Sequence, residues 1–183
     1  WALPPAFASF RAPVMVVFGA FEADLFNGLN AGDVACLQVR LKGADGKTVD
    51  ADATRRFGEK LIEKVQARDV AVIINDRADL AAELGADGVH IGQSDGTFKD
   101  AKKWVGEHGI VGVTCHDSRH LAMVAGEQGA DYVAFGAFYP TETKEAPLHA
   151  ETELLHWWQE MMGPAWVCSM RNVAAGDEGH RGG

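Results

Sequence analysis

Short apolar runs alternate with amphipathic segments along most of the chain, and this alternation limits the folds that are possible. A run that is apolar at nearly every position is typical of a strand buried on both faces, as in a parallel sheet. Parallel strands need a crossover connection, and an amphipathic helix is the usual one. The predicted strands are residues 14–18, 35–41, 70–75, 88–92, 110–115, 131–138 and 165–170.

The segments between these runs have the periodicity of helices that pack on a sheet. In residues 50–69, Phe57, Leu61 and Val65 recur at every fourth position and form one apolar stripe. Three later segments repeat the design, and each has a glycine near its end, where glycine commonly terminates a helix. These segments are residues 77–86 with Gly85, 118–130 with Gly129, and 151–163 with Gly163.

Composition and charge narrow the class of protein. A chain of 183 residues suits one domain with a sizeable core. Its formal charge of −9 argues against nucleic acid or an anionic membrane as the main partner. No apolar run approaches the roughly 20 residues that span a bilayer. The first residues do not resemble a signal peptide, and an odd number of cysteines suits reduced thiols, so we expect a cytoplasmic protein.

Polar residues gather at the carboxyl ends of successive predicted strands. In a (β/α)₈ barrel these ends converge on one mouth, where active sites lie. A doubly wound sheet would gather ligands mainly at its switch point, and no glycine fingerprint follows the first strand, so the pattern favours the barrel. The residues are Gln38, Arg40, Lys42, Asn75, Asp76, Gln93, Asp95, Thr114, His116, Thr141, Thr143 and Lys144.

The strand count predicts an α/β TIM (β/α)₈-type barrel that lacks its last βα unit. Seven strands are recognised, and the stretch after the seventh is polar, rich in glycine and aperiodic. We therefore expect one barrel domain over residues 1–170 and a tail over residues 171–183. An open sheet of this kind would expose strand edges, so self-association through the gap is also expected.

Two acidic residues follow adjacent predicted strands and suggest a magnesium site. Asp76 and Asp95 would lie at the same rim, and Mg²⁺ is usually held by one or two carboxylates together with substrate phosphates and water. Arg40, Lys42 and Lys144 would supply positive charge at that rim. Carboxylates, cations and hydroxyls around one mouth predict a diphosphate bound with Mg²⁺.

Structural interpretations of the same residues stay open. Asp76 could cap the helix that begins near Arg77, and Gln38 could be a satisfied amide of the core. Cys115 and His116 are adjacent and suggest a catalytic dyad. However, neighbours on a strand point to opposite faces, so we do not expect one.

Five stretches resemble thiamine-phosphate synthases, in the same order and at suitable spacing. They are CLQVRLKG, IINDRADLA, GADGVHIGQSD, GVTCHD and GADYVAFGAFYPTETK, and they cover roughly residues 34–162. The resemblance implies a barrel enzyme that joins hydroxymethylpyrimidine diphosphate to thiazole phosphate and releases diphosphate. Leu41 stands where the family often has an acid, and Thr114 replaces a frequent serine but keeps the hydroxyl.

The resemblance also implies roles for individual residues. Arg40, Lys42 and Lys144 would act on the departing diphosphate, and Asp76 with Asp95 would bind Mg²⁺. The pyrimidine diphosphate would contact Gln38, Val39, Arg40, Leu41, Lys42, Asn75, Thr114 and Lys144, and the thiazole phosphate would contact Thr141, Glu142 and Thr143.

Three alternatives compete with this interpretation. One is another phosphate-binding barrel isomerase, which would need a general base at a strand end, and His116 is the only obvious candidate. The related thiazole tautomerase shares the fold but does not need the paired aspartates, so Asp76 with Asp95 disfavours it. A barrel that binds phosphates without catalysis is the third alternative. The family continues after the seventh strand with a Gly-Gly loop, an eighth strand and further phosphate contacts that are not matched here, so we expect lowered activity.

Overall fold

A computed structural model describes residues 14–17, 22–31, 34–46, 48–136, 153–162 and 166–169. Its strands form one sheet in which every neighbouring pair is parallel and the spatial order is the chain order. A doubly wound sheet reverses its order at the switch point, so that alternative is wrong. The strands are β1 (Val14–Val17), β2 (Cys36–Val39), β3 (Ala71–Asn75), β4 (Gly88–Ile91), β5 (Ile110–His116), β6 (Tyr132–Phe135) and β7 (Trp166–Ser169).

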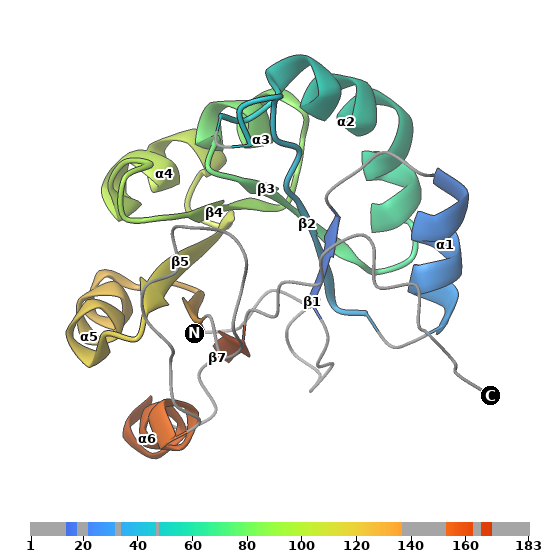
Figure 1. Ribbon diagram of the computed structural model, residues 1–183. Helices are drawn as coiled ribbons and strands as arrows, with labels where there is room; N and C mark the ends of the chain where they lie inside the picture. Colours follow the sequence, from blue (N-terminus) through green and yellow to red (C-terminus); the bar gives the residue numbers. More distant parts are fainter. Residues whose placement is uncertain are drawn as a thin grey trace.

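A helix lies in each connection between consecutive strands, so the predicted α/β fold with a parallel sheet is confirmed. Figure 1 shows the helices along the outside of the twisted sheet. Closure of the sheet into a (β/α)₈ barrel stays a prediction, and the predicted tail lies outside the described residues. The helices are α1 (Glu22–Ala31), α2 (Ala51–Gln66), α3 (Ala78–Glu83), α4 (Phe98–Val105), α5 (Arg119–Gln128) and α6 (Glu153–Met162).

Local sequence signals fix the ends of the helices. Asp50 caps α2 by accepting a hydrogen bond from the backbone N–H of Ala53 at 2.8 Å, and Ser118 caps α5 in the same way. Gly129 ends α5 in a left-handed conformation, as its position predicted. Within the described residues, no helix combines the length and the apolar character needed to cross a membrane.

Successive side chains along each strand separate into two faces. The outer face packs against the helices in one large core, to which α2 contributes the predicted stripe of Phe57, Leu61 and Val65. The inner face points away from the helices and holds a smaller apolar cluster. Both faces are buried, which explains why the strands are apolar at nearly every position. The inner cluster consists of Cys36, Ala71, Ile73, Ile110 and Tyr132.

Two aspartates lock adjacent strands at the amino end of the sheet. Asp87 accepts a hydrogen bond from the backbone N–H of Val72 at 2.7 Å, and Asp131 accepts one from Val111 at 2.8 Å. Each aspartate follows a Gly-Ala pair, directly before β4 or β6. We call this end the amino edge, and the opposite end, where the strands finish, the carboxyl edge.

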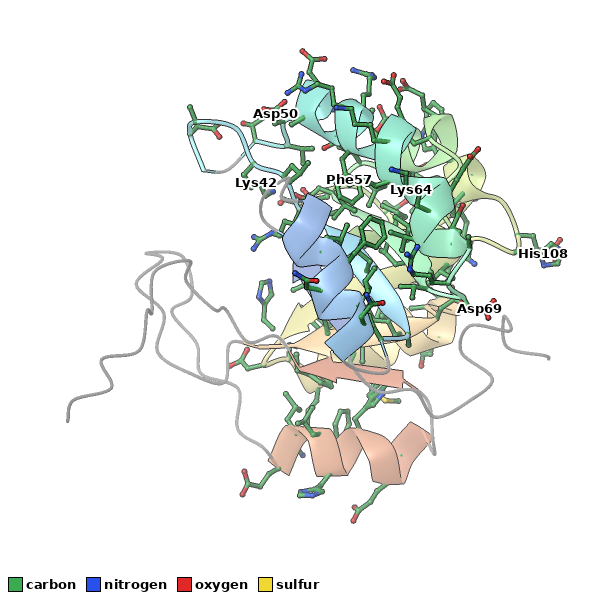
Figure 2. The ribbon with its side chains drawn as sticks, turned by 90° about the vertical axis from the view of Figure 1, so that its right-hand side faces the viewer. Lys42, Asp50, Phe57, Lys64, Asp69 and His108 are labelled. Atoms are coloured by element: carbon green, nitrogen blue, oxygen red, sulfur yellow. The ribbon has the colours of Figure 1, made fainter. Side chains whose placement is uncertain are left out.

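The two edges lie far apart on the molecule. In Figure 2, Lys42 and Asp50 project at the left, beyond the end of β2, whereas Asp69 and His108 project at the right, before β3 and β5. The stabilising aspartates and the predicted site residues therefore occupy opposite ends of the same strands.

Gly112 on β5 makes room for the ring of Tyr132 on β6. The two residues are partners in the strand register, and both face inward. A Cβ atom at residue 112 would stand 2.0 Å from Cζ of Tyr132, which no packing can accommodate without movement. The position therefore requires glycine as long as the tyrosine ring stays where it is.

We expect Gly112→Ala to destabilise the fold by about 3 kcal/mol, because the added methyl group collides with a buried ring on a strand that is itself held in register. Gly43→Ala is the matched control, since its Cβ would meet its nearest atoms at 3.7 Å, an ordinary contact. Urea unfolding followed by circular dichroism measures both. Equal losses of stability in the two variants would show that contact with the Tyr132 ring does not restrict position 112 to glycine.

Candidate active site

Gln38 and Asn75 form a buried amide pair on the inner face. Nε2 of Gln38 donates to Oδ1 of Asn75 at 2.6 Å, and the residues are only 3% and 5% exposed. Gln38 is thus a satisfied buried amide, but its partner is another predicted site residue on the next strand. The pair fixes two amide groups at the carboxyl edge, where they can present hydrogen-bonding atoms to a heterocyclic ring.

Lys42 and Asp76 form an ion pair at the same edge. Nζ of Lys42 donates to Oδ2 of Asp76 at 2.5 Å, and both side chains are mostly buried. The backbone of Asp76 is left-handed, with φ of +64°, and its N–H donates to the carbonyl of His90 at 2.7 Å. The N-cap of α3 is Arg77, which makes no side-chain cap. The capping interpretation of Asp76 is therefore wrong, and its carboxylate instead faces Lys42.

Asp95 lies close to Asp76 on the loop between β4 and α4. Its Oδ2 accepts a hydrogen bond from the backbone N–H of Gly92 at 2.9 Å. Burial raises the pKa of Asp95, and the negative charge of Asp76 raises it further, while the charge of Lys42 acts in the opposite sense. Two neighbouring negative carboxylates repel each other, so the arrangement favours a bound cation.

The donor set fits Mg²⁺ better than a metal that needs a full protein cage. Among the described residues, no group of three or more histidine, cysteine, aspartate or glutamate side chains could hold a metal ion. Mg²⁺ is commonly held by one or two carboxylates and completes its octahedral shell with water and substrate phosphates. Asp76 and Asp95 carry oxygen donors of that kind and number, and they are the residues that would hold such an ion.

Thr114 ends a buried chain of hydrogen bonds on the inner face. Its Oγ1 lies 2.7 Å from Nε2 of His90, whose Nδ1 lies 2.9 Å from Oη of Tyr132. Gln93 donates to the carbonyl of Thr114 at 2.5 Å. The register with β6 shifts directly afterwards, between Thr114 and His116. This irregularity stands beside the residue predicted to contact the diphosphate.

His90 is neutral in this setting. The pKa of the imidazole is lowered to about 4, mainly by complete burial; the negative charge of Asp76 opposes this shift, and the positive charge of Arg40 contributes to it. Sequence reasoning missed both His90 and Tyr132. The available signal was a histidine in an otherwise apolar strand, at a position that alternation places on the inner face.

The side chains of two predicted site residues point away from the polar groups of the carboxyl edge. Val39 and Leu41 point into the outer core and are 1% and 5% exposed, so only their main chain could meet a substrate. Leu41 thus points away from its charged neighbours, as expected. The predicted residues of the later loop, Thr141, Glu142, Thr143 and Lys144, lie outside the described residues.

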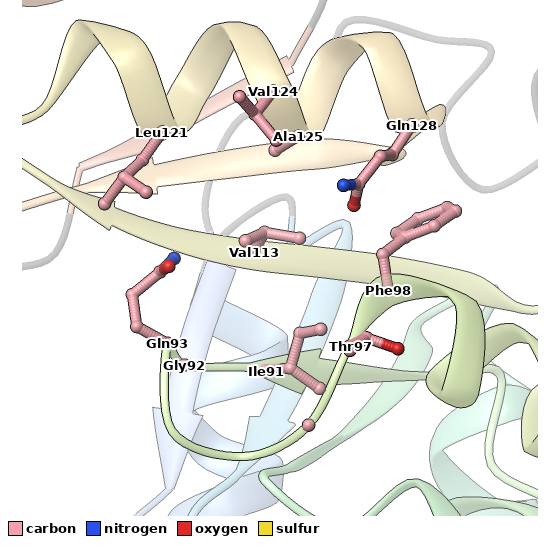
Figure 3. A pocket seen from close by; sticks show the side chains of 11 residues that line it. Ile91, Gly92, Gln93, Thr97, Phe98, Val113, Leu121, Val124, Ala125 and Gln128 are labelled. Carbon is pink, nitrogen blue, oxygen red and sulfur yellow. The ribbon is translucent and has the colours of Figure 1, made fainter.

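A pocket of about 180 Å³ lies on the other side of the sheet. Figure 3 shows it between the outer face of β4 and β5 and helix α5, with Ile91 and Val113 on its floor and Leu121 and Val124 above. Gln38, His90 and Thr114 belong to the opposite face, so this pocket is separate from their side chains.

Comparison with known proteins identifies the family. A sequence profile described as thiamine monophosphate synthase matches residues 19–177. This chain belongs to that family. The thiamine-phosphate synthase of Rhodospirillum centenum is 61% identical over 143 residues, which are 78% of this chain and 67% of the relative. The thiamine-phosphate synthase of Hyphomonas neptunium is 53% identical over 143 residues, which are 78% and 64% of the two chains. The chain thus spans about two thirds of the length of these relatives.

A solved structure shows the same fold. Thiamine phosphate pyrophosphorylase from Pyrococcus furiosus superposes with a TM-score of 0.67 at 23% identity, covering 87% of this chain and 75% of that one. This likeness supports the coarser part of the fold-class prediction, an α/β fold with a parallel sheet.

The structure excludes a nucleophilic Cys115. The thiol is buried, burial raises its pKa to about 12, and His116 beside it is exposed. At about pH 8 a thiol with that pKa has roughly a thousandfold less thiolate than one with the usual value of 9.0. We therefore expect iodoacetamide to modify Cys115 far more slowly in the native protein than in urea, measured by mass spectrometry of the peptide. Rapid native modification would contradict the burial.

Proposed function

We propose that this chain catalyses the thiamine-phosphate synthase reaction, which joins hydroxymethylpyrimidine diphosphate and thiazole phosphate and releases diphosphate. The observation that carries the proposal is the cluster of Lys42, Asp76 and Asp95 at the carboxyl edge, where one lysine and two carboxylates interact. A diphosphate needs positive charge and a divalent cation. In this cluster Lys42 would supply the positive charge, and the two carboxylates would hold the cation. Family membership and close relatives of that name support the same conclusion.

The thiazole nitrogen attacks the methylene carbon of the pyrimidine, and the bond from that carbon to the diphosphate oxygen breaks. The substrate supplies its own nucleophile, so the protein stabilises the leaving group and aligns the rings. The positive charges of Arg40, Lys42 and Lys144 stabilise the negative charge on the departing diphosphate. The hydroxyl of Thr114 donates a hydrogen bond to one of its oxygens. Bound Mg²⁺, held by Asp76 and Asp95, would supply further charge neutralisation on the diphosphate.

Recognition of the two substrates divides between residues early and late in the sequence. The amide pair Gln38–Asn75 orients the pyrimidine through its ring edge, and the main chain of Val39 and Leu41 lines the same end of β2. Thr141, Glu142 and Thr143 hold the thiazole phosphate. We propose that the sheet closes as a (β/α)₈-type barrel around these groups, in a cytoplasmic enzyme whose partners are these small molecules.

The alternative functions, a thiazole tautomerase and a non-catalytic barrel, predict different roles for the same residues. A thiazole tautomerase would not need Asp76 with Asp95, and a barrel that only binds phosphate would retain diphosphate affinity without turnover. Product analysis with both substrates and Mg²⁺ separates the three, since only a synthase forms thiamine phosphate and diphosphate in equal amounts. Diphosphate binding without product would favour the non-catalytic barrel.

Asp76→Asn and Asp95→Asn should each lower kcat/KM by about a hundredfold, since each removes an anionic metal ligand that matters for the departing diphosphate. Calorimetric titration should also show that magnesium no longer strengthens diphosphate binding. Asp52→Asn, in an exposed carboxylate on the first turn of α2, is the control and should change neither quantity. An unchanged magnesium dependence in both site variants would refute the metal assignment.

Lys144→Ala should lower kcat more than it weakens binding of thiazole phosphate, because the proposed target of its charge is the leaving group in the transition state. Lys103→Ala removes an exposed lysine from α4 and serves as the control for loss of one positive charge. Steady-state kinetics with each substrate varied in turn separates the two effects. Equal losses in turnover and thiazole phosphate binding would indicate a general structural role.

A further inference from the structure

Three neighbouring strands contribute to the chain of hydrogen bonds that ends at Thr114. Gly112 leaves the space that the ring of Tyr132 fills, Oη of Tyr132 meets Nδ1 of His90, and Nε2 of His90 meets Oγ1 of Thr114. The histidine and the threonine are 2% and 8% exposed, so water is largely excluded from this contact. The hydroxyl of Thr114 is therefore oriented by the protein.

The direction of the protons along this chain follows from what each group can donate. A neutral imidazole has one N–H and one lone pair, and the partners decide which nitrogen carries the proton. A threonine hydroxyl has a single proton. If that proton is given to a diphosphate oxygen, which only accepts, Oγ1 can only accept from His90. Nε2 must then carry the proton of the imidazole, and Nδ1 must accept from the hydroxyl of Tyr132.

We propose that Tyr132 and His90 are positioning residues that set the proton order Tyr132 O–H to Nδ1, Nε2–H to Oγ1 of Thr114, and Thr114 O–H to the diphosphate. This inference rests on the proposed function, in which Thr114 binds the diphosphate. The opposite proton order would turn a lone pair of Thr114 Oγ1 toward the diphosphate and weaken its binding. Tyr132 thus acts on the substrate through two intervening side chains, without touching it.

One further contact keeps Thr114 in place while its hydroxyl is oriented. The side-chain amide of Gln93 donates to the carbonyl oxygen of Thr114 at 2.5 Å. The backbone of Thr114 is therefore fixed from the β4 side, and its side chain from His90. A hydroxyl held in this way loses little conformational freedom when the anion binds.

The direct test is the tautomer of His90, read from the ¹⁵N chemical shifts of histidine-labelled full chain saturated with magnesium diphosphate. His90→Gln assigns the signal by its loss. We expect a protonated Nε2 and an unprotonated Nδ1 in wild type. A protonated Nδ1 with an unprotonated Nε2 overturns the proposal, and this measurement needs no variant of Tyr132 to fold.

A double-mutant cycle separates orientation from mere structural support. Calorimetry with magnesium diphosphate should show about tenfold weaker binding for Thr114→Val, which removes a hydrogen bond to a charged group. Tyr132→Phe should weaken binding severalfold in wild type but have no further effect in the Thr114→Val background. Thr54→Val is the control, since Thr54 is also buried, in α2, and its hydroxyl donates to the carbonyl of Asp50.

The outcomes distinguish this inference from the function on which it rests. Unchanged affinity in Thr114→Val would remove both the proposed role of Thr114 and the proton order. Weaker binding in Thr114→Val, together with an equal effect of Tyr132→Phe in both backgrounds, would overturn only the positioning role. Loss of synthase turnover alone supports neither, because a merely damaged fold produces it too; the tautomer and the coupling decide.

Discussion

A polar side chain buried inside a protein must find a hydrogen-bond partner, and this requirement organises the inner face of the sheet. Here the partners are other side chains of the same face: Gln38 bonds Asn75, while His90 lies between Thr114 and Tyr132. Each contact joins different strands, so the pairs also tie the sheet together. Leaving one such group without a partner costs about 1–3 kcal/mol, which makes the network hard to alter one residue at a time.

The same network would serve the diphosphate site proposed at the carboxyl edge. Amides and hydroxyls held by neighbours present their remaining groups in fixed directions, and the charged residues stand just beyond them. Lys42 and Asp76 are paired, and Asp95 is close enough for the charge of Asp76 to raise its pKa. A group of opposite charges held in place loses little energy to reorganisation when the charge of a substrate shifts during reaction.

Sequence patterns gave most of the fold because each strand and helix carries its own local signal. Continuous apolar runs located every strand of the sheet, and Ser118 and Gly129 marked the ends of α5 as expected. The placement of Asp76 and Asp95 on successive loops also followed from strand order. The role of His90 could not be read in this way, because its partners Thr114 and Tyr132 lie 24 and 42 residues away in the sequence. Only strand register brings those three together, and a local pattern does not contain register.

Aspartate shows how position decides chemistry in this fold. At the amino edge, Asp87 and Asp131 accept hydrogen bonds from backbone N–H groups of the preceding strand, and these bonds stabilise the sheet. At the carboxyl edge, Asp76 faces a lysine and a second carboxylate, a combination that suits a cation and a phosphorylated ligand. Because the two edges are separated by the length of the strands, the stabilising set can remain fixed while loops at the other end change. The residue type alone therefore predicts little, and the end of the strand on which it stands predicts a great deal.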